Sequence, residues 1–558
     1  MHRLVLLGLA AGVSVTLLGG CSSRQASDET AGGPPAPIEE VVPVGEADRS
    51  RAGRAAALDV IATPMPAPYS PAPPREHRER YPDAGDNPVK VAAEEPVSTF
   101  SIDVDTASYG NVRRLLGHGV LPPADAVRIE ELINYFRYDY PAPADGEAFR
   151  VVTEVGPAPW HPGRRLLHIG LRGASIDTAD LPPANLVFLV DVSGSMDSPQ
   201  KIDLVKASMK LLARQLDADD RLSIAVYAGA AGTALEPTPG DRTAAIEAAI
   251  DRLQPGGSTY GEAGIRLAYA LARQAYIEGG INRVILATDG DFNVGVTSVD
   301  ELKELVARER ESGVTLTVLG FGSGNYNDAL MQALAQTGNG NAAYVDSFNE
   351  ARKVLVEELG ATLSVIAKDV KVQVEFNPAV VAEYRLLGYE TRLLAREDFN
   401  NDRVDAGEIG AGHTVTALYE LTLRGSDARR IDPLRYGSER PPASGRHADE
   451  LALVRLRHKE PTGRTSRLQE IPVRVADMRD SLAETRDDFR FSAAVAAFGT
   501  LLRGGTAVES FGYDDVIELA RDARGSDPDG YRSEFLGLAR SAAALAGSPP
   551  PSPAVGRH

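Results

Sequence analysis

The pattern of apolar and polar positions changes character twice along the chain. Between residues 185 and 367, short runs that are wholly apolar alternate with segments whose apolar residues recur every three or four positions. The run Leu186–Val190 is apolar on both faces, as a buried parallel strand is, and the apolar positions of Lys201–Leu216 lie on one helical face. This alternation predicts an α/β fold with a doubly wound, mostly parallel sheet that is covered by helices on both sides.

We call residues 185–367 the α/β unit. Its expected strands are Leu186–Val190, Leu222–Tyr227, Arg283–Thr288, Val314–Gly320 and Ala342–Val345. Its expected helices are Lys201–Leu216, Ala244–Leu253, Tyr260–Glu278, Val299–Ser312, Asp328–Thr337 and Asn349–Ala367.

Strands are also expected on both flanks of the α/β unit. Before it, Phe149–Val155 and Leu166–Leu171 are expected strands; after it, polar and apolar residues alternate in Val372–Phe376, Val415–Leu423, Leu451–Arg457 and Ile471–Val475. This alternation is typical of antiparallel strands with one solvent-facing side. Because the ends of a domain often lie close together, we expect Phe149–Leu171 to pair with the later strands. The α/β unit is then inserted between β-rich flanking segments.

Helical periodicity returns at both ends of the folded region. Helices are expected at Ser108–Leu121 and Ala126–Phe136, and a C-terminal helical cap at Asp487–Leu502, Tyr513–Arg521 and Tyr531–Leu545. Residues 22–95 hold 12 of the 37 prolines and cannot build a core. The expected organisation is a signal peptide at 1–20, a disordered Pro/Ala-rich tether at 21–95, an N-terminal helical and β region at 96–184, the α/β unit at 185–367, a β-rich domain at 368–480, the helical cap at 481–546 and a disordered tail at 547–558.

The first residues have the features of a secretory signal peptide. A basic start precedes the apolar run Leu4–Leu18, which is too short to span a bilayer comfortably. The tetrad Leu18-Gly19-Gly20-Cys21 resembles a bacterial lipobox, which implies that Cys21 is lipidated and that the protein is anchored to a membrane in the bacterial cell envelope. The alternative is a plain signal peptide with an incidental cysteine. By the same resemblance, Ser22 favours the outer membrane, facing the periplasm, over the inner membrane.

Composition excludes several classes of function. The chain has 558 residues, with 78 acidic and 59 basic side chains and a net charge of −19. So acidic a protein is a poor partner for nucleic acid, which requires clustered Lys and Arg. Cys21 is the single cysteine, so neither an intrachain disulfide nor a cysteine-rich zinc site can form.

Oxygen-bearing side chains follow the buried strands of the α/β unit. The sequence Asp191-Val192-Ser193-Gly194-Ser195 comes after the first strand, and Asp289 comes after the strand Arg283–Thr288. Thr259 lies in the Gly-rich loop Gly256–Thr259, just before a helix. Because ligands bind beyond the carboxyl ends of strands in such sheets, these oxygens can converge on a small hard cation.

The combination of Asp-x-Ser-x-Ser, a later Thr and Thr-Asp-Gly resembles the metal-ion-dependent adhesion site (MIDAS) of von Willebrand factor type A (VWA) domains. The resemblance implies that Asp191, Ser193, Ser195, Thr259 and Asp289 hold Mg²⁺, with Mn²⁺ or Ca²⁺ as alternatives. It also implies an open coordination position that accepts an Asp or Glu from a partner protein. The phrases Phe100–Thr106 and Thr288–Gly295 resemble a YfbK-like subfamily of bacterial VWA lipoproteins.

These features lead to a non-enzymatic hypothesis, a lipid-anchored envelope protein that binds a partner protein through its metal. One alternative is an envelope scaffold that uses the flanking domains. A metal-dependent hydrolase is less well supported, because residues 185–367 contain no histidine to act as a general base.

Two other motifs leave questions open. The segment from Asp398 to Glu408 begins like a calcium loop but lacks its glycine and its final glutamate, so it is either an irregular metal site or a turn rich in Asp and Asn. His161 and His168 follow Trp160, and we interpret both as structural residues.

Overall fold

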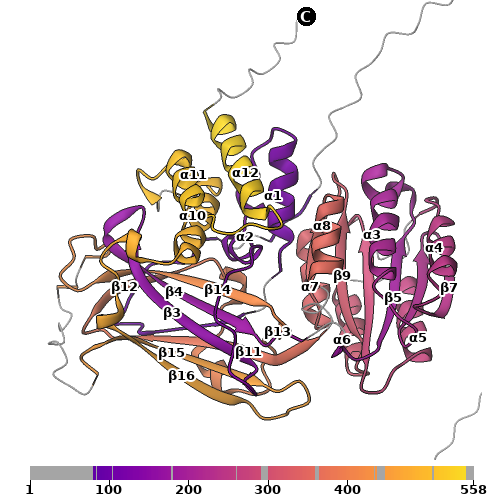
Figure 1. Ribbon diagram of the computed structural model, residues 1–558, viewed down its shortest axis with the longest axis horizontal. Helices are drawn as coiled ribbons and strands as arrows, with labels where there is room; N and C mark the ends of the chain where they lie inside the picture. The colour runs from indigo at the N-terminus through magenta and orange to yellow at the C-terminus, as the bar shows by residue number, and fades with distance from the viewer. Residues whose placement is uncertain are drawn as a thin grey trace, which may run out of the picture. The chain divides into compact units, whose positions relative to one another are not determined.

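The computed structural model describes residues 79–82, 85–102, 105–176, 180–258, 261–290, 299–358, 364–432, 434–435, 447–505 and 508–547 (Figure 1). The signal peptide, Cys21, most of the expected tether, and residues 548–558 of the expected tail lie outside these ranges, as does Thr259. None of the helices within them combines the length and apolar character that crossing a bilayer requires.

The α/β unit contains a sheet with the strand order β10-β9-β8-β5-β6-β7. Every pairing in it is parallel except that of the edge strand β7. The strands are β5 (Ala184–Asp191), β6 (Arg221–Tyr227), β7 (Ala231–Pro239), β8 (Ile281–Thr288), β9 (Thr315–Phe321) and β10 (Ala342–Val345). The predicted α/β fold class is confirmed. Strand β7 was missed, because its glycine and two prolines are tolerated only at the edge of a sheet.

Helices cover both faces of this sheet because alternate residues of β5 point to opposite sides. Leu186 and Phe188 pack in one core with α3 (Leu204–Ala213), α4 (Thr243–Asp251) and α8 (Phe348–Arg352). Val187 and Leu189 pack in a second core with α5 (Gly261–Gln274), α6 (Val299–Arg310) and α7 (Asp328–Thr337). The wholly apolar run in the sequence is thus explained by burial on both faces.

The flanking strands form two antiparallel sheets that share one core. The first has the order β1-β12-β14-β4-β3, and the second has the order β13-β11-β15-β16 with β2 paired to β11. The predicted pairing of Phe149–Leu171 with later strands is confirmed, because β4 pairs with β14 from Thr414↔Arg172 to Leu421↔Arg165. The strands are β1 (Lys90–Val91), β2 (Val97–Ser101), β3 (Phe149–Ala158), β4 (His161–Gly173), β11 (Val365–Phe376), β12 (Val381–Leu387), β13 (Gly407–Gly410), β14 (Thr414–Leu423), β15 (Glu450–Lys459) and β16 (Arg467–Arg474).

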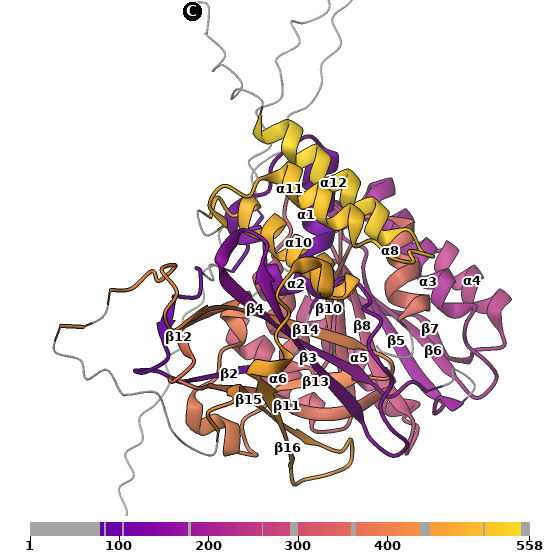
Figure 2. The same cartoon turned by 60° about the vertical axis from the view of Figure 1, so that its left-hand side comes forward.

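Helices from the two ends of the folded region form one layer. α1 (Ala107–Gly117) and α2 (Ile129–Asn134) share a core with α10 (Asp487–Leu502), α11 (Tyr513–Asp522) and α12 (Tyr531–Ala546). Both views show α1 beside α12 (Figures 1 and 2). On β4, Leu166 belongs to this helical core and the next residue, Leu167, belongs to the core between the sheets. The helical layer therefore contains α1 and α2, which were predicted to belong to a separate N-terminal region, as well as the predicted C-terminal cap.

Buried arginines tie the helical layer to the α/β unit. Arg113 of α1 contacts Asp346 at 2.5 Å and Glu350 at 2.7 Å. Arg128, which precedes α2, contacts Asp328 at 2.7 Å, and both side chains are almost completely buried. These ion pairs join segments that lie 200 or more residues apart in the sequence.

Two predicted boundaries are wrong. Ordered structure begins before residue 95, since Lys90 of β1 pairs with Tyr384 and the amide of Arg80 donates to the carbonyl of Tyr326. The predicted helix Asn349–Ala367 instead ends in a π-helical turn at Lys353–Glu357, and β11 begins at Val365. The β-branched residues that start β11 favour the strand once β13 and β15 are available as partners.

Candidate metal centre

Neighbouring parallel strands bring the predicted acidic residues together. Asp191 is the last residue of β5, and Asp289 directly follows β8. The two strands pair in register up to Val190↔Ala287, so both carboxylates lie at the same edge of the sheet. Each carboxylate belongs to a buried residue.

Asp191 is held by hydrogen bonds on both carboxylate oxygens. The backbone N–H of Ser193 donates to Oδ1 at 2.8 Å. The hydroxyls of Tyr227 and Thr288 donate to Oδ2 at 3.1 and 3.3 Å. Burial raises the pKa of the Asp191 carboxyl, hydrogen bonds from Ser193 lower it, and the nearby charge of Asp289 raises it.

The two predicted serines form the outer part of the site. Ser193 is buried and Ser195 is exposed, and their Oγ atoms lie 3.0 Å apart. Adjacent oxygens around an octahedral Mg²⁺ are roughly 2.9 Å apart at metal–oxygen distances of about 2.0–2.1 Å. The serine pair therefore matches the spacing of two neighbouring ligands, with one of them open to solvent.

Thr259 lies outside the described residues, but the loop that leads to it is described. The N–H of Gly256 donates to the carbonyl of Val192 at 2.7 Å, and the N–H of Gly194 donates to the carbonyl of Gly257 at 3.0 Å. These bonds hold the glycine-rich loop against the Asp191–Ser195 turn. Gly257 has φ +92°, a conformation that favours glycine.

Lys201, which is not among the predicted site residues, contacts the site. The Lys201 ammonium lies 2.8 Å from Asp289 Oδ2 and donates to the carbonyl of Ser195 at 3.0 Å. Lys201 belongs to a π-helical turn at Pro199–Asp203, ahead of α3. Its side chain passes over Gly322, where a Cβ would lie only 2.3 Å from Lys201 Cε.

The donor set fits a small hard cation. It offers two buried carboxylates and two hydroxyls, and the Lys201 ammonium shows that positive charge is accommodated beside Asp289. Within the described ranges, no cluster of three or more His, Cys, Asp or Glu could hold a metal. A metal at this edge would therefore depend on hydroxyl oxygens, which suit Mg²⁺ or Mn²⁺ better than softer ions. The hydrogen bonds from Tyr227 and Thr288 to Asp191 were not predicted from the sequence. The only sequence feature that could have indicated them is that both residues end buried strands.

Lysine side chains hydrogen-bond the backbone of the segment that begins like a calcium loop. The Lys371 ammonium donates to the carbonyls of Asp398 and Asn401 at 3.1 and 2.6 Å. The Lys459 ammonium donates to the carbonyl of Asp402 at 2.7 Å. Because two ammonium groups use these oxygens, the structure favours the turn over a second metal site.

The two histidines after Trp160 have separate structural environments. His168 is fully buried and lies 3.0 Å from the Tyr140 hydroxyl. His161 is the first residue of β4, and its Nε2 lies 3.7 Å from Oε2 of Glu509. Neither arrangement forms a metal site within the described residues.

Family models match three parts of the chain. Residues 185–357 match the von Willebrand factor type A domain, and residues 75–168 match a model described as von Willebrand factor. Residues 361–545 match a model described as "Uncharacterized protein YfbK, C-terminal". A VWA domain supports a role in protein interaction or adhesion.

The individual proteins that resemble this chain cover different shares of it. The chain is 47% identical over 466 residues to YfbK of Escherichia coli K12, covering 82% of this chain and 80% of that protein. It is 26% identical over 266 residues to inter-alpha-trypsin inhibitor heavy chain H3 of Mesocricetus auratus, covering 44% of this chain and 29% of that protein. A solved von Willebrand factor type A structure from Catenulispora acidiphila aligns with a TM-score of 0.40 and 15% identity, covering 73% of this chain and 91% of that one. The chain belongs to the YfbK family of bacterial proteins, which is built around a VWA domain.

Proposed function

We propose that this protein is a lipid-anchored envelope protein that binds a partner protein through a divalent metal held by Asp191, Ser193, Ser195, Thr259 and Asp289. The observation that carries the proposal is the convergence of two buried carboxylates, the buried Ser193 and the exposed Ser195 at one edge of the sheet. A cation there leaves a coordination position on the Ser195 side, where a partner could supply an Asp or Glu. On a surface with net charge −19, the metal would provide the local positive charge that attracts a carboxylate.

Calorimetric titration tests the metal site directly. The chain from Ser22 to His558, which contains all the residues that the structure describes, is titrated with Mg²⁺ and with Mn²⁺. We expect saturable binding that Asp191→Ala abolishes. Asp241→Ala is the matched control, because Asp241 is exposed and far from the site. It follows Pro239, which pairs with Arg221 at the start of β6, whereas the candidate metal centre lies beyond the ends of the parallel strands. Equal binding by both variants would show that the metal does not use this site.

Partner binding is tested by capture from envelope extracts. A partner retained in Mg²⁺ and released by EDTA should not be retained by Asp191→Ala. Replacing the partner's exposed Asp and Glu residues one at a time should identify a single carboxylate whose loss abolishes capture. Retention that is indifferent to both EDTA and Asp191→Ala would favour the alternative, a scaffold that acts through the flanking domains.

The proposed anchor is a lipid on Cys21, with the protein at the outer membrane and facing the periplasm. Metabolic labelling with a fatty acid should mark the wild-type protein and not Cys21→Ser. Membrane fractionation should place the wild type in the outer membrane, and Ser22→Asp should move it to the inner membrane. An unlabelled protein released into the soluble fraction would refute the anchor without affecting the metal site.

A further inference from the structure

A polar cavity lies between the α/β unit and the antiparallel sheets, away from the candidate metal centre. Its volume is about 310 Å³. Arg283 near the start of β8 and Thr317 of β9 line it from one side, and Glu408 of β13 lines it from the other. Because Asp289 follows the far end of β8, the cavity and the metal centre are at opposite ends of that strand.

Among the residues that the structure describes, Arg283 is a buried cation without an acidic ion-pair partner. It is 2% exposed, and within this part of the chain its guanidinium hydrogen-bonds from Nη1 to the Thr317 hydroxyl at 2.9 Å. Its Nε has no hydrogen-bond partner, and no carboxylate of the described residues lies within ion-pair distance of the guanidinium. Burial lowers the pKa of Arg283 to about 10, an effect that the more distant charge of Glu408 partly offsets. A buried charge is costly unless it is paired.

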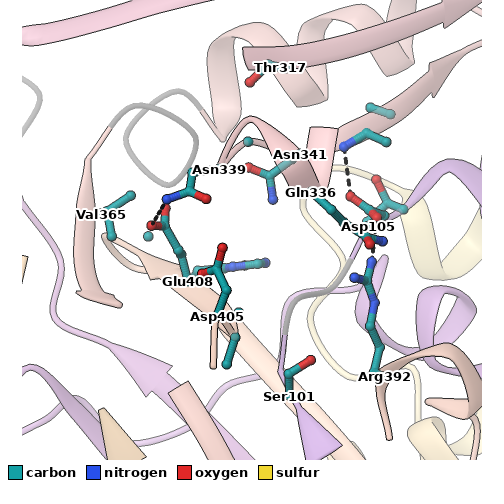
Figure 3. A pocket seen from close by; sticks show the side chains of 18 of the residues that line it. Ser101, Asp105, Thr317, Gln336, Asn339, Asn341, Val365, Arg392, Asp405 and Glu408 are labelled. Carbon is teal, nitrogen blue, oxygen red and sulfur yellow. Dashed lines mark hydrogen bonds and ion pairs between the residues drawn. The ribbon is translucent and has the colours of Figure 1, made fainter. Parts of the chain in front are cut away.

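Other charged groups in the cavity already have partners. Asp105 accepts from Arg392 at 2.8 Å, and Asp405 accepts from Arg310 at 2.6 Å. Glu408 lies 3.5 Å from the side-chain nitrogen of Asn339. Figure 3 shows Asp405 and Glu408 together on one side with Asn339 beside Glu408, the Asp105–Arg392 pair on another side, and Asn341 between the two groups.

We propose that this cavity binds a small organic carboxylate, with Arg283 as its counter-ion. A carboxylate can accept from the Nη1 and Nη2 N–H groups that Thr317 does not use, in the planar, two-bond arrangement that Arg favours. The side chains of Asn339, Asn341 and Thr317 can hydrogen-bond the remaining polar atoms. The acidic side chains in the wall would repel a dianion such as phosphate more strongly than a carboxylate with a single negative charge.

The cavity limits the size of the ligand but not its source. A water molecule takes up roughly 30 Å³ in the liquid, so the volume corresponds to about ten waters. That space accepts either a free small acid or the terminal carboxylate of a peptide. Both sources present the same group to Arg283, and the choice of probe separates them.

Thermal unfolding of the chain from Ser22 to His558 tests this proposal with defined probes. Acetate represents a free acid, N-acetylglycine represents a peptide terminus, and acetamide is the neutral control, all at equal ionic strength. We expect a saturable rise of several degrees in the unfolding midpoint with at least one carboxylate and none with acetamide. The larger response, to acetate or to N-acetylglycine, identifies the source.

Two variants make the result specific to Arg283. Arg283→Met should lose the response, and Arg308→Met, which removes an exposed arginine of α6, should keep it. Without ligand, Arg283→Met should be at least as stable as the wild type, because it replaces an unpaired buried charge with an apolar side chain. The proposal is overturned if no carboxylate shifts the midpoint, if Arg283→Met responds equally, or if phosphate stabilises more strongly than either carboxylate.

Discussion

The Lys201 ammonium lies 2.8 Å from Oδ2 of Asp289, whose carboxylate is one of the proposed metal ligands. Asp289 is fully buried, and the lysine side chain is 12% exposed. A buried carboxylate requires a nearby positive charge. The lysine meets this requirement from within the chain, so a metal ion must displace the ammonium or share the carboxylate with it.

Lys201→Met should therefore strengthen Mg²⁺ binding, on the order of tenfold, which corresponds to about 1.4 kcal/mol. The variant should also be less stable than the wild type in EDTA and regain stability with Mg²⁺. Calorimetry measures the affinity, and denaturant unfolding with and without metal measures the stability. Lys206→Met, which alters a lysine bonded to the Asp251 carbonyl on the same side of the unit, should leave the affinity unchanged. An unchanged or weaker affinity in Lys201→Met would mean that the lysine does not compete with the ion.

Gly322→Ala should displace the Lys201 side chain, because the added methyl group would overlap with it. Gly322 has φ +76°, and a Cβ there would lie within 2.4 Å of both Cγ and Cε of Lys201. Gly324 also has a positive φ, but a Cβ there meets nothing within 4 Å. Each alanine should cost about 1–3 kcal/mol of backbone strain, with a further loss in Gly322→Ala from the displaced lysine. Equal losses of unfolding free energy in the two variants would show that Lys201 moves aside freely.

Arg128→Met should be strongly destabilising. Arg128 is 1% exposed, pairs with Asp328 at 2.7 Å and donates to Glu131 at 3.2 Å. Its loss leaves two carboxylates without their cation between α2 and α7, at a cost of about 3–5 kcal/mol. Urea unfolding measures this loss.

The control for Arg128 is Arg352→Met. Arg352 is 46% exposed and pairs with Glu357 at 3.0 Å. Solvent screens such a surface pair and it contributes little to stability, so this variant should unfold close to the wild-type midpoint. A similar small effect in Arg128→Met would show that the buried ion pairs do not stabilise the junction with the helical layer.

His168 should make stability depend on pH in the acidic range. Burial, together with the charge of Arg486, lowers the pKa of His168 from 6.5 to about 3. Between these values the unfolded chain binds a proton that the folded chain excludes, so the free energy of unfolding falls as the pH is lowered from 6.5. This one group contributes at most about 1.4 kcal/mol per pH unit.

His168→Gln removes that contribution, and denaturant unfolding at several pH values checks it. The wild type should lose stability from pH 7 to pH 4 more steeply than the variant, because all other titrating groups are common to both. His118→Gln, at an exposed position after α1, should follow the wild type. Parallel curves for the wild type and His168→Gln would show that His168 is protonated in the folded protein.

Much of the fold could be predicted because burial leaves a local pattern. Helix α7 (Asp328–Thr337) and strand β10 (Ala342–Val345) match their predicted bounds, since each has one clear periodicity and ends at polar or glycine residues. The candidate site was predictable for a related reason. Asp191 and Asp289 both come directly after buried runs, and parallel strands end at one edge of the sheet.

The class of the fold and the places of Asp191 and Asp289 after buried strands follow from the sequence, because strand periodicity and residues at strand ends are local properties. Which distant residues meet depends on the tertiary structure. The folded chain brings Lys201 against Asp289, buries Arg283 beside a cavity without an acidic ion-pair partner among the described residues, and joins α1 and α2 to the C-terminal helices in one core. These contacts link segments tens to hundreds of residues apart. Their partners are chosen by the packing of the whole chain, which no local pattern encodes.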